Sequence, residues 1–167
     1  MADAVLDPRP TVPNAVLGLL AFALAVTVAA AVGGLAAASA AEQYASLARP
    51  SWAPPAEVFG PVWTVLYALV AVSGWLVWRR AGVTGARTAL TGYGVQLVLN
   101  ALWTPLFFGA GWYGVAFAEL CVLLVAVVAT VVLFARHSRL AAGLLVPYLL
   151  WIGFACAVNL AVWQLNP

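Results

Sequence analysis

Aromatic and polar side chains recur at helical spacing within three apolar stretches of the chain. Residues three or four apart share one face of a helix, so each set forms a stripe. The stripes are Phe59, Trp63 and Tyr67; Gln96, Asn100, Trp103 and Phe107; and Tyr148, Trp151, Ala155 and Asn159. Lipid cannot satisfy an amide, so an amide in a membrane must face protein or a cavity. Two interpretations stay open: packing between helices, and a pocket for a flat hydrophobic ligand with aromatic walls and a few polar groups.

Outside these stripes, the sequence contains no recognisable catalytic or metal-binding motif. His137 is the only histidine and lies in a short basic loop, so we predict no metal site. Cys121 and Cys156 lie in apolar runs and are interpreted as small buried hydrophobic residues. Glu119 is the one acid within an apolar stretch. It is either a functional group or a carboxyl that is protonated or bonded to a neighbouring helix.

The composition excludes an ordinary soluble domain. Of 167 residues, 66% are apolar and 7% are charged, whereas soluble domains carry about 25% charged residues. A water-facing surface cannot be built from this inventory, but a lipid-facing surface can. The formal net charge of +2 is too small for nucleic-acid binding, so we expect membrane lipid and no nucleic acid as a partner.

The apolar stretches predict an all-α integral membrane bundle of five transmembrane helices. Stretches of about 20 apolar residues are long enough to span a bilayer. An N-terminal tail (1–13) precedes a single domain (14–167), whose loop 42–57 contains several charged residues and prolines and is expected outside the membrane. The predicted spans are about 14–41, 59–78, 89–108, 112–135 and 140–163.

The arginines predict the orientation of these spans. With five spans, the tail and the second and fourth loops share one side of the membrane and hold every arginine except Arg49. Basic residues concentrate on the cytoplasmic side, so we expect a cytoplasmic N-terminus. The helical spans and a composition rich in alanine and free of lysine favour a bacterial cell membrane, inner rather than outer.

Four blocks of sequence resemble the TspO/MBR family, whose members are also called tryptophan-rich sensory protein, translocator protein or peripheral-type benzodiazepine receptor. The blocks cover predicted spans two, three and five in the family's order and spacing, and Asn159 extends the match. They are Arg49 to Pro55 (RPSWAPP), Val58 to Tyr67 (VFGPVWTVLY), Gln96 to Gly109 (QLVLNALWTPLFFG) and Val146 to Trp151 (VPYLLW).

The resemblance implies a five-helix bundle that binds porphyrins, such as protoporphyrin IX or haem, as ligands rather than as an obligatory cofactor. It also implies binding of benzodiazepine-type compounds, and we expect a homodimer whose loop 42–57 acts as a lid over the pocket. The matching pocket positions are Tyr44, Trp63, Tyr67, Asn100, Trp103, Trp151 and Ala155. The first stripe adds Phe59 to this set of predicted ligand-binding residues.

Three functions are compatible with this resemblance. The first is a porphyrin-binding sensory or regulatory protein. The second is an enzyme that degrades protoporphyrin IX in light, with Trp63 and Trp151 as the photochemical residues. The third is a transporter of tetrapyrroles or other lipophilic molecules, against which the lack of an inverted repeat weighs.

The chain departs from the family pattern in two respects, at three positions. Leu160 and Gln164 stand where vertebrate members have the tyrosine and arginine of a cholesterol-recognition pattern, so cholesterol binding is doubtful. Glu57 stands where a tryptophan often follows the proline pair of the first loop, which is expected to change the mouth of the pocket.

Overall fold

The computed structural model describes residues 12–36 and 40–166, and every regular element within them is helical. This confirms the all-α prediction for the described part of the chain. Most of the predicted N-terminal tail (1–11) and residues 37–39 of the first predicted span lie outside it. The elements are α1 (Val12–Ala36), α2 (Ala40–Ser46), the 3-10 turn η1 (Ala56–Val58), α3 (Phe59–Gly85), α4 (Arg87–Thr104), the π-helical turn η2 (Pro105–Gly109), α5 (Tyr113–Ala135) and α6 (Arg139–Leu165).

Within the described part of the chain, four helical segments are long and apolar enough to cross a membrane: Asn14–Leu35, Ala56–Gly85, Tyr113–Ala135 and Arg139–Leu165. Their outward faces carry large apolar side chains, such as Leu17 and Val125, with 64% and 69% of their surface exposed. Such faces are stable in lipid and not in water. The chain is therefore an integral membrane protein.

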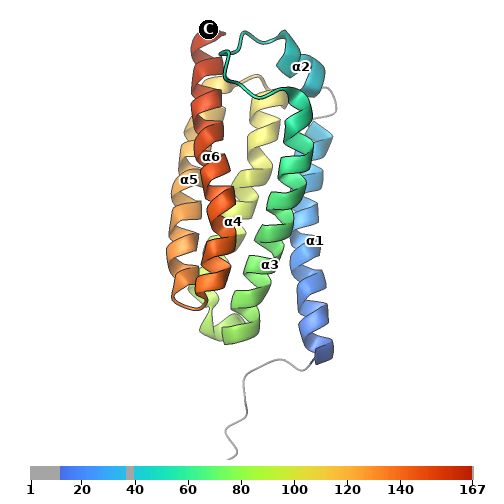
Figure 1. The fold of residues 1–167 in the computed structure, drawn as a ribbon, viewed down its shortest axis with the longest axis vertical. Helices are drawn as coiled ribbons and strands as arrows, with labels where there is room; N and C mark the ends of the chain where they lie inside the picture. Colours follow the sequence, from blue (N-terminus) through green and yellow to red (C-terminus); the bar gives the residue numbers. More distant parts are fainter. Residues whose placement is uncertain (1–11, 37–39, 167) are drawn as a thin grey trace, which may run out of the picture.

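The long helices form a closed ring (Figure 1). In that ring α1 packs against α3 and α4, α3 packs against α6, α6 packs against α5, and α5 packs against α4. The order around the ring thus differs from the order along the chain. The short helix α2 lies at one end of the ring, beside the ends of α1 and α3, and the segment that follows it runs to the end of α6 (Figure 1).

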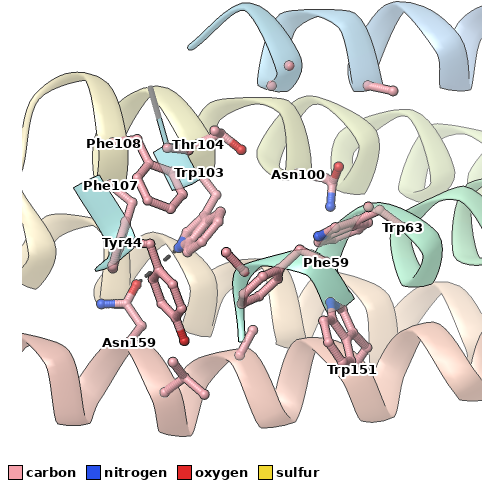
Figure 2. A pocket seen from close by; sticks show the side chains of 18 of the residues that line it. Tyr44, Phe59, Trp63, Asn100, Trp103, Thr104, Phe107, Phe108, Trp151 and Asn159 are labelled. Carbon is pink, nitrogen blue, oxygen red and sulfur yellow. Dashed lines mark hydrogen bonds between the residues drawn. The ribbon is translucent and has the colours of Figure 1, made fainter. Parts of the chain in front are cut away.

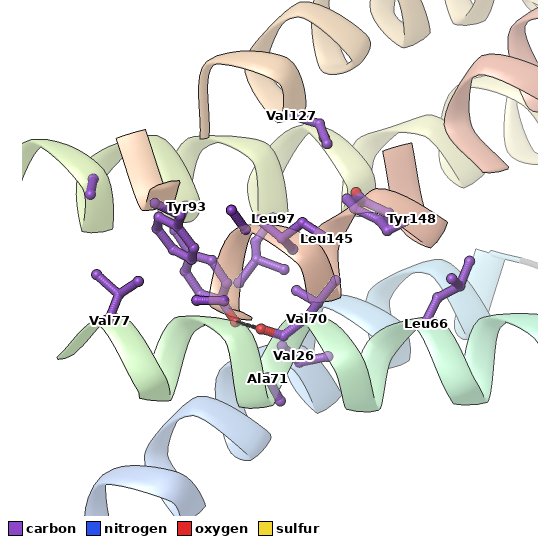
Figure 3. Packing of buried hydrophobic residues seen from close by; sticks show 14 of the residues in the cluster. Val26, Leu66, Val70, Ala71, Val77, Tyr93, Leu97, Val127, Leu145 and Tyr148 are labelled. Carbon is purple, nitrogen blue, oxygen red and sulfur yellow. Dashed lines mark hydrogen bonds between the residues drawn. The ribbon is translucent and has the colours of Figure 1, made fainter. Parts of the chain in front are cut away.

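The lower part of the ring is filled by aliphatic side chains from all five long helices, many of which Figure 3 shows. Val70, Val127 and Leu145 are almost completely buried there. The Tyr93 hydroxyl, also buried, donates to the Val70 carbonyl at 3.3 Å (Figure 3). Tyr148 is buried in this packed region (Figure 3), and its ring centroid lies 6.2 Å from that of Trp63.

Hydrogen bonds to backbone carbonyls join the helices within this apolar interior. The Ser73 hydroxyl on α3 donates to the Ala141 carbonyl on α6 at 2.8 Å. The Trp75 indole donates to the Ala15 carbonyl on α1, also at 2.8 Å. These bonds fix the register of α3 against both of its neighbours, because water cannot replace a lost partner in a membrane.

The helix boundaries differ from the predicted spans at three places. The first predicted span ended at Ala41, whereas α1 ends at Ala36 and Ala40 begins the separate helix α2. The second was predicted to end at residue 78, but α3 is helical beyond the arginines that follow. Arginine does not terminate a helix, since its long side chain can extend to the interface. The break comes at Gly82, whose φ of 64° is a conformation that glycine adopts readily.

The third difference follows from Pro105. The predicted span 89–108 is divided into α4, which ends at Thr104, and the wider turn η2. Proline lacks the backbone N–H of a regular turn, and Ala110 N–H donates to the Pro105 carbonyl at 2.9 Å, closing a π-helical turn. The last two spans lie within two residues of α5 and α6, and the Ser138 hydroxyl caps α6 by accepting from Ala141 N–H at 3.1 Å.

Candidate functional site

A cavity of about 330 Å³ lies inside the ring at the end covered by α2 (Figure 2). Small-molecule sites have volumes of about 300–1,000 Å³, so this cavity is at the lower end of that range. Side chains of α1, α2, α3, α4, η2 and α6 line it. The structure brings together around it all eight residues predicted to bind a ligand: Tyr44, Phe59, Trp63, Tyr67, Asn100, Trp103, Trp151 and Ala155.

Aromatic rings in mutual contact form most of the wall. Trp63 and Tyr67, one turn apart on α3, stack with ring centroids 5.0 Å apart. Phe59 contacts Tyr44 edge to face at 5.3 Å and Trp151 at 5.9 Å, so it links α2 to α6. These contacts hold the rings at fixed angles, and flat apolar walls of this kind suit a planar hydrophobic ligand.

One polar group, the amide of Asn100, is oriented by a hydrogen bond at the cavity wall. The Tyr67 hydroxyl donates to Asn100 Oδ1 at 2.8 Å. Because the oxygen accepts this bond, the amide nitrogen is the free end, and Figure 2 shows it directed toward Trp63. The site thereby offers a hydrogen-bond donor to an acceptor on a ligand, such as a carbonyl oxygen or a ring nitrogen.

A second amide, Asn159, positions Trp103. Asn159 is buried on α6, and its Oδ1 accepts from the Trp103 indole N–H at 3.0 Å (Figure 2). Its amide nitrogen donates to the Tyr113 carbonyl at the start of α5, at 2.9 Å. One side chain therefore connects three helices, and it fixes the indole that forms one side of the cavity.

The predicted lid, residues 42–57, is more ordered than a simple loop. Its first residues belong to α2, and η1 begins at Ala56. Tyr44, the buried residue of α2, donates from its hydroxyl to the Pro54 carbonyl at 3.1 Å. The Asn166 side chain, beyond the end of α6, accepts from Ala48 N–H at 3.1 Å and donates to the Ala48 carbonyl at 2.9 Å. The Tyr44 bond therefore closes the segment on itself, and the two Asn166 bonds tie it to the end of α6 at Ala48.

Several lining residues were missed by the sequence reasoning. Thr104 follows Asn100 by four residues, so helical periodicity alone could have identified it. From α1, the cavity is lined by Ala30, Gly33 and Gly34. Such small, apolar residues do not indicate a binding site in the sequence. A Cβ atom at Gly33 would lie 3.2 Å from the Thr104 hydroxyl, so a small residue is needed where α1 meets α4.

Two members of the predicted stripes do not line the cavity. Gln96 and Tyr148 are each 1% exposed and lie in the packed interior, and neither the Gln96 amide nor the Tyr148 hydroxyl has a hydrogen-bond partner. Glu119 also lies away from the cavity, on α5, with both carboxyl oxygens buried and without a partner. For Gln96 and Tyr148 the stripes reflect helix packing, whereas the other members of each stripe line the cavity.

The described residues offer little other chemistry. Within residues 12–36 and 40–166, no three His, Cys, Asp or Glu side chains gather closely enough to hold a metal ion. Cys121 and Cys156 are both free thiols and only partly buried, not fully as their apolar surroundings suggested. The candidate site is therefore the aromatic cavity.

Comparison with known proteins gives a consistent result. The model of the TspO/MBR family matches residues 21–164. The chain is 43% identical over 125 residues to a translocator protein from Homo sapiens, covering 74% of each chain. It is 37% identical over 152 residues to the tryptophan-rich protein TspO from Archaeoglobus fulgidus (90% of this chain and 98% of that protein). It is 38% identical over 149 residues to a tryptophan-rich sensory protein from Cereibacter sphaeroides (87% and 92%). The chain belongs to the TspO/MBR family.

Proposed function

We propose that this protein is a membrane sensory or regulatory protein of the translocator type whose ligand is a porphyrin, such as protoporphyrin IX or haem. The observation that carries the proposal is the cavity whose walls contain Trp63, Trp103 and Trp151 together with Phe59 and Tyr67. The relatives named tryptophan-rich sensory protein and translocator protein support the sensory or translocator role.

The chemistry of the cavity matches that of a tetrapyrrole. A porphyrin is flat and aromatic, so it gains contact area against the indole and phenol rings that form the walls. Its carbon framework is apolar, and the lining residues carry no charged side chain. The free amide nitrogen of Asn100 adds one hydrogen-bond donor.

Titration of the purified protein with protoporphyrin IX in the dark, followed by tryptophan emission and porphyrin absorption, tests this proposal. We expect saturable quenching that weakens in Trp63→Phe and Trp151→Phe. Trp112→Phe is the matched control, because that indole is 60% exposed and does not line the cavity. Quenching that does not saturate, or that Trp112→Phe changes as much, would contradict the proposal.

A second candidate function is light-dependent breakdown of protoporphyrin IX. The observation that favours it is that Trp63 and Trp151 both border the same cavity, where an indole beside a photoexcited porphyrin can donate an electron (Figure 2). The Trp63→Phe/Trp151→Phe double variant separates the two functions. If it binds porphyrin but no longer bleaches it in light, the indoles take part in photochemistry; full bleaching would exclude them.

We also propose that all five long helices cross the membrane. In α4, which is less apolar than the others, Gln96 and Asn100 are buried inside the ring, while Val98 and Leu102 are exposed on the outer face. Its two amide side chains therefore do not meet lipid. The exposed Trp52, Trp112 and Trp163 gather at the lid end, as expected of indoles at the headgroup level.

The arginine distribution supports a cytoplasmic N-terminus in a bacterial cell membrane, with the lid on the outer side. Labelling of single cysteines, introduced into a variant that lacks Cys121 and Cys156, tests this orientation. A cysteine in the lid is expected to react with an impermeant maleimide in intact cells. Crosslinking of the same variants in membranes tests the expected homodimer.

A further inference from the structure

The cavity wall and the rim of its mouth differ in charge. No charged residue lines the wall, whereas the rim carries Glu42 beside the lining residue Ala41 and Glu57 beside the lining residue Ala56. An ionised group inside the wall would lose its hydration without gaining a partner. If the ligand is a porphyrin with carboxylates, these groups must therefore lie at the mouth, where the two acids repel them.

Arg49 is the one basic residue at this end of the described structure. The other described arginines, Arg79, Arg80, Arg87, Arg136 and Arg139, belong to the end of α3, the start of α4 and the turn between α5 and α6, at the far end of the ring (Figure 1). A ligand carboxylate that projects from the cavity on the lid side is consequently attracted toward one side chain, that of Arg49. Among residues 12–36 and 40–166, Arg49 forms no ion pair that would have to be broken first.

Two contacts hold Arg49 beside the cavity. Its guanidinium carbon lies 4.4 Å from the centroid of the Tyr44 ring, and Tyr44 itself lines the cavity. The preceding residue, Ala48, is held at the end of α6 by two hydrogen bonds with the Asn166 side chain. The guanidinium lies over the Tyr44 ring and donates no hydrogen bond to another described residue. Its N–H groups are therefore free, and these are the groups that bind a carboxylate bidentately.

We propose that Arg49 binds a carboxylate of the ligand at the mouth of the cavity, and that this contact selects amphipathic acids over neutral molecules of the same shape. The proposal rests on the proposed function, because it requires that a flat aromatic ligand occupies the cavity. It assigns to the lid a role in recognition in addition to closure.

Protoporphyrin IX and its dimethyl ester form a matched pair of probes, because they share the macrocycle and differ in the two carboxylates. Both are titrated against the wild-type protein and Arg49→Gln by tryptophan quenching. We expect Arg49→Gln to weaken binding of the acid about tenfold, the effect of losing a hydrogen bond to a charged group. Binding of the ester is expected to change less than about twofold. For each ligand, the dissociation constant of the variant is divided by that of the wild-type protein. Partition of the ligand into detergent affects both constants equally and cancels in this ratio.

Two further variants separate charge from structure. Arg49→Lys keeps the charge but not the planar fork, so it is expected to bind the acid with intermediate affinity. Arg87→Gln removes an equal charge from an exposed position at the far end and is expected to leave both affinities unchanged. Raising the salt concentration should weaken binding of the acid and not of the ester.

Each remaining outcome has a distinct meaning. Equal weakening of acid and ester by Arg49→Gln would show that Arg49 only supports Tyr44 and would overturn the carboxylate contact. Unchanged binding of both ligands would overturn it as well. Either result is still compatible with porphyrin binding in the cavity. If neither ligand binds the wild-type protein, both the proposed function and the Arg49 contact are contradicted.

Discussion

Replacement of Asn159 by alanine tests the polar contacts that hold the cavity wall in place. The side chain is 1% exposed, accepts from the Trp103 indole and donates to the Tyr113 carbonyl. Alanine removes both bonds at once. The variant leaves the Trp103 indole N–H on α4 without its protein partner and removes the side-chain bond to the Tyr113 carbonyl at the start of α5.

The expected loss follows from these two bonds. Hydrogen bonds between membrane helices contribute about 0.6 kcal/mol on average and up to about 1.7 kcal/mol. A buried polar group that loses its partner costs about 1–3 kcal/mol. The Trp103 N–H lies at the cavity, where water can reach it, so we expect the lower part of the combined range, about 2 kcal/mol.

Unfolding in mixed micelles with increasing SDS, followed by the circular dichroism of the helices, measures this loss. A double-mutant cycle with Trp103→Phe isolates the indole–amide bond, for which we expect a coupling energy of about 0.6–1.7 kcal/mol. Thr64→Ala is the control, because that exposed hydroxyl bonds only to Gly60 of its own helix.

The reasoning would be refuted if Asn159→Ala unfolded within about 0.5 kcal/mol of the wild-type protein, the range of ordinary surface substitutions. It would also fail if Asn159→Ala and Trp103→Phe were additive. Additivity would mean that the bond between the two side chains contributes no measurable stability.

Three further predictions concern the lid, the helix contacts and the buried amide. Asn166→Ala should speed hydrogen exchange of the lid backbone around Ala48 about fivefold, since about 1 kcal/mol of bonding is lost; unchanged exchange would contradict the tether. Gly74→Ala places a Cβ atom 2.7 Å from the Phe22 ring and should destabilise the bundle by about 1–3 kcal/mol in the SDS assay, whereas Gly94→Ala, with open space, should not. Gln96→Met should be neutral or stabilising, because the buried amide has no partner; a loss above about 1 kcal/mol would reveal a bond to water.

Much of the fold was predictable because the membrane imposes long apolar segments. The last two spans were predicted to within two residues, since Ser138 and the short basic turn before it mark their boundary clearly. The end of α3 was not predictable from charge. Its boundary depends on the left-handed conformation of Gly82, and the sequence does not reveal which of several nearby glycines adopts it.

The cavity residues on α3, α4 and α6 were predictable because amides and aromatic rings mark the inward face of a helix. The inner side of α1 was not, because Ala30, Gly33 and Gly34 contribute by being small, and small residues are common throughout that helix. The predicted stripes also included two residues that do not line the cavity. Gln96 and Tyr148 continue the same faces downward, but there the helices are close enough to exclude the cavity.

The order of helices around the ring has a consequence for biosynthesis. In the ring α3 and α6 are neighbours, but in the sequence α4 and α5 lie between them. The cavity wall that carries Trp151 is therefore synthesised two helices later than the wall that carries Trp63. As the chain enters the bilayer from its N-terminal side, α1, α3, α4 and α5 can associate before α6 arrives. Until α6 docks, the aromatic face of α3 has no opposing wall. The cavity is therefore complete only after this last docking step. If the proposed ligand is present at that moment, its binding would stabilise the newly closed ring.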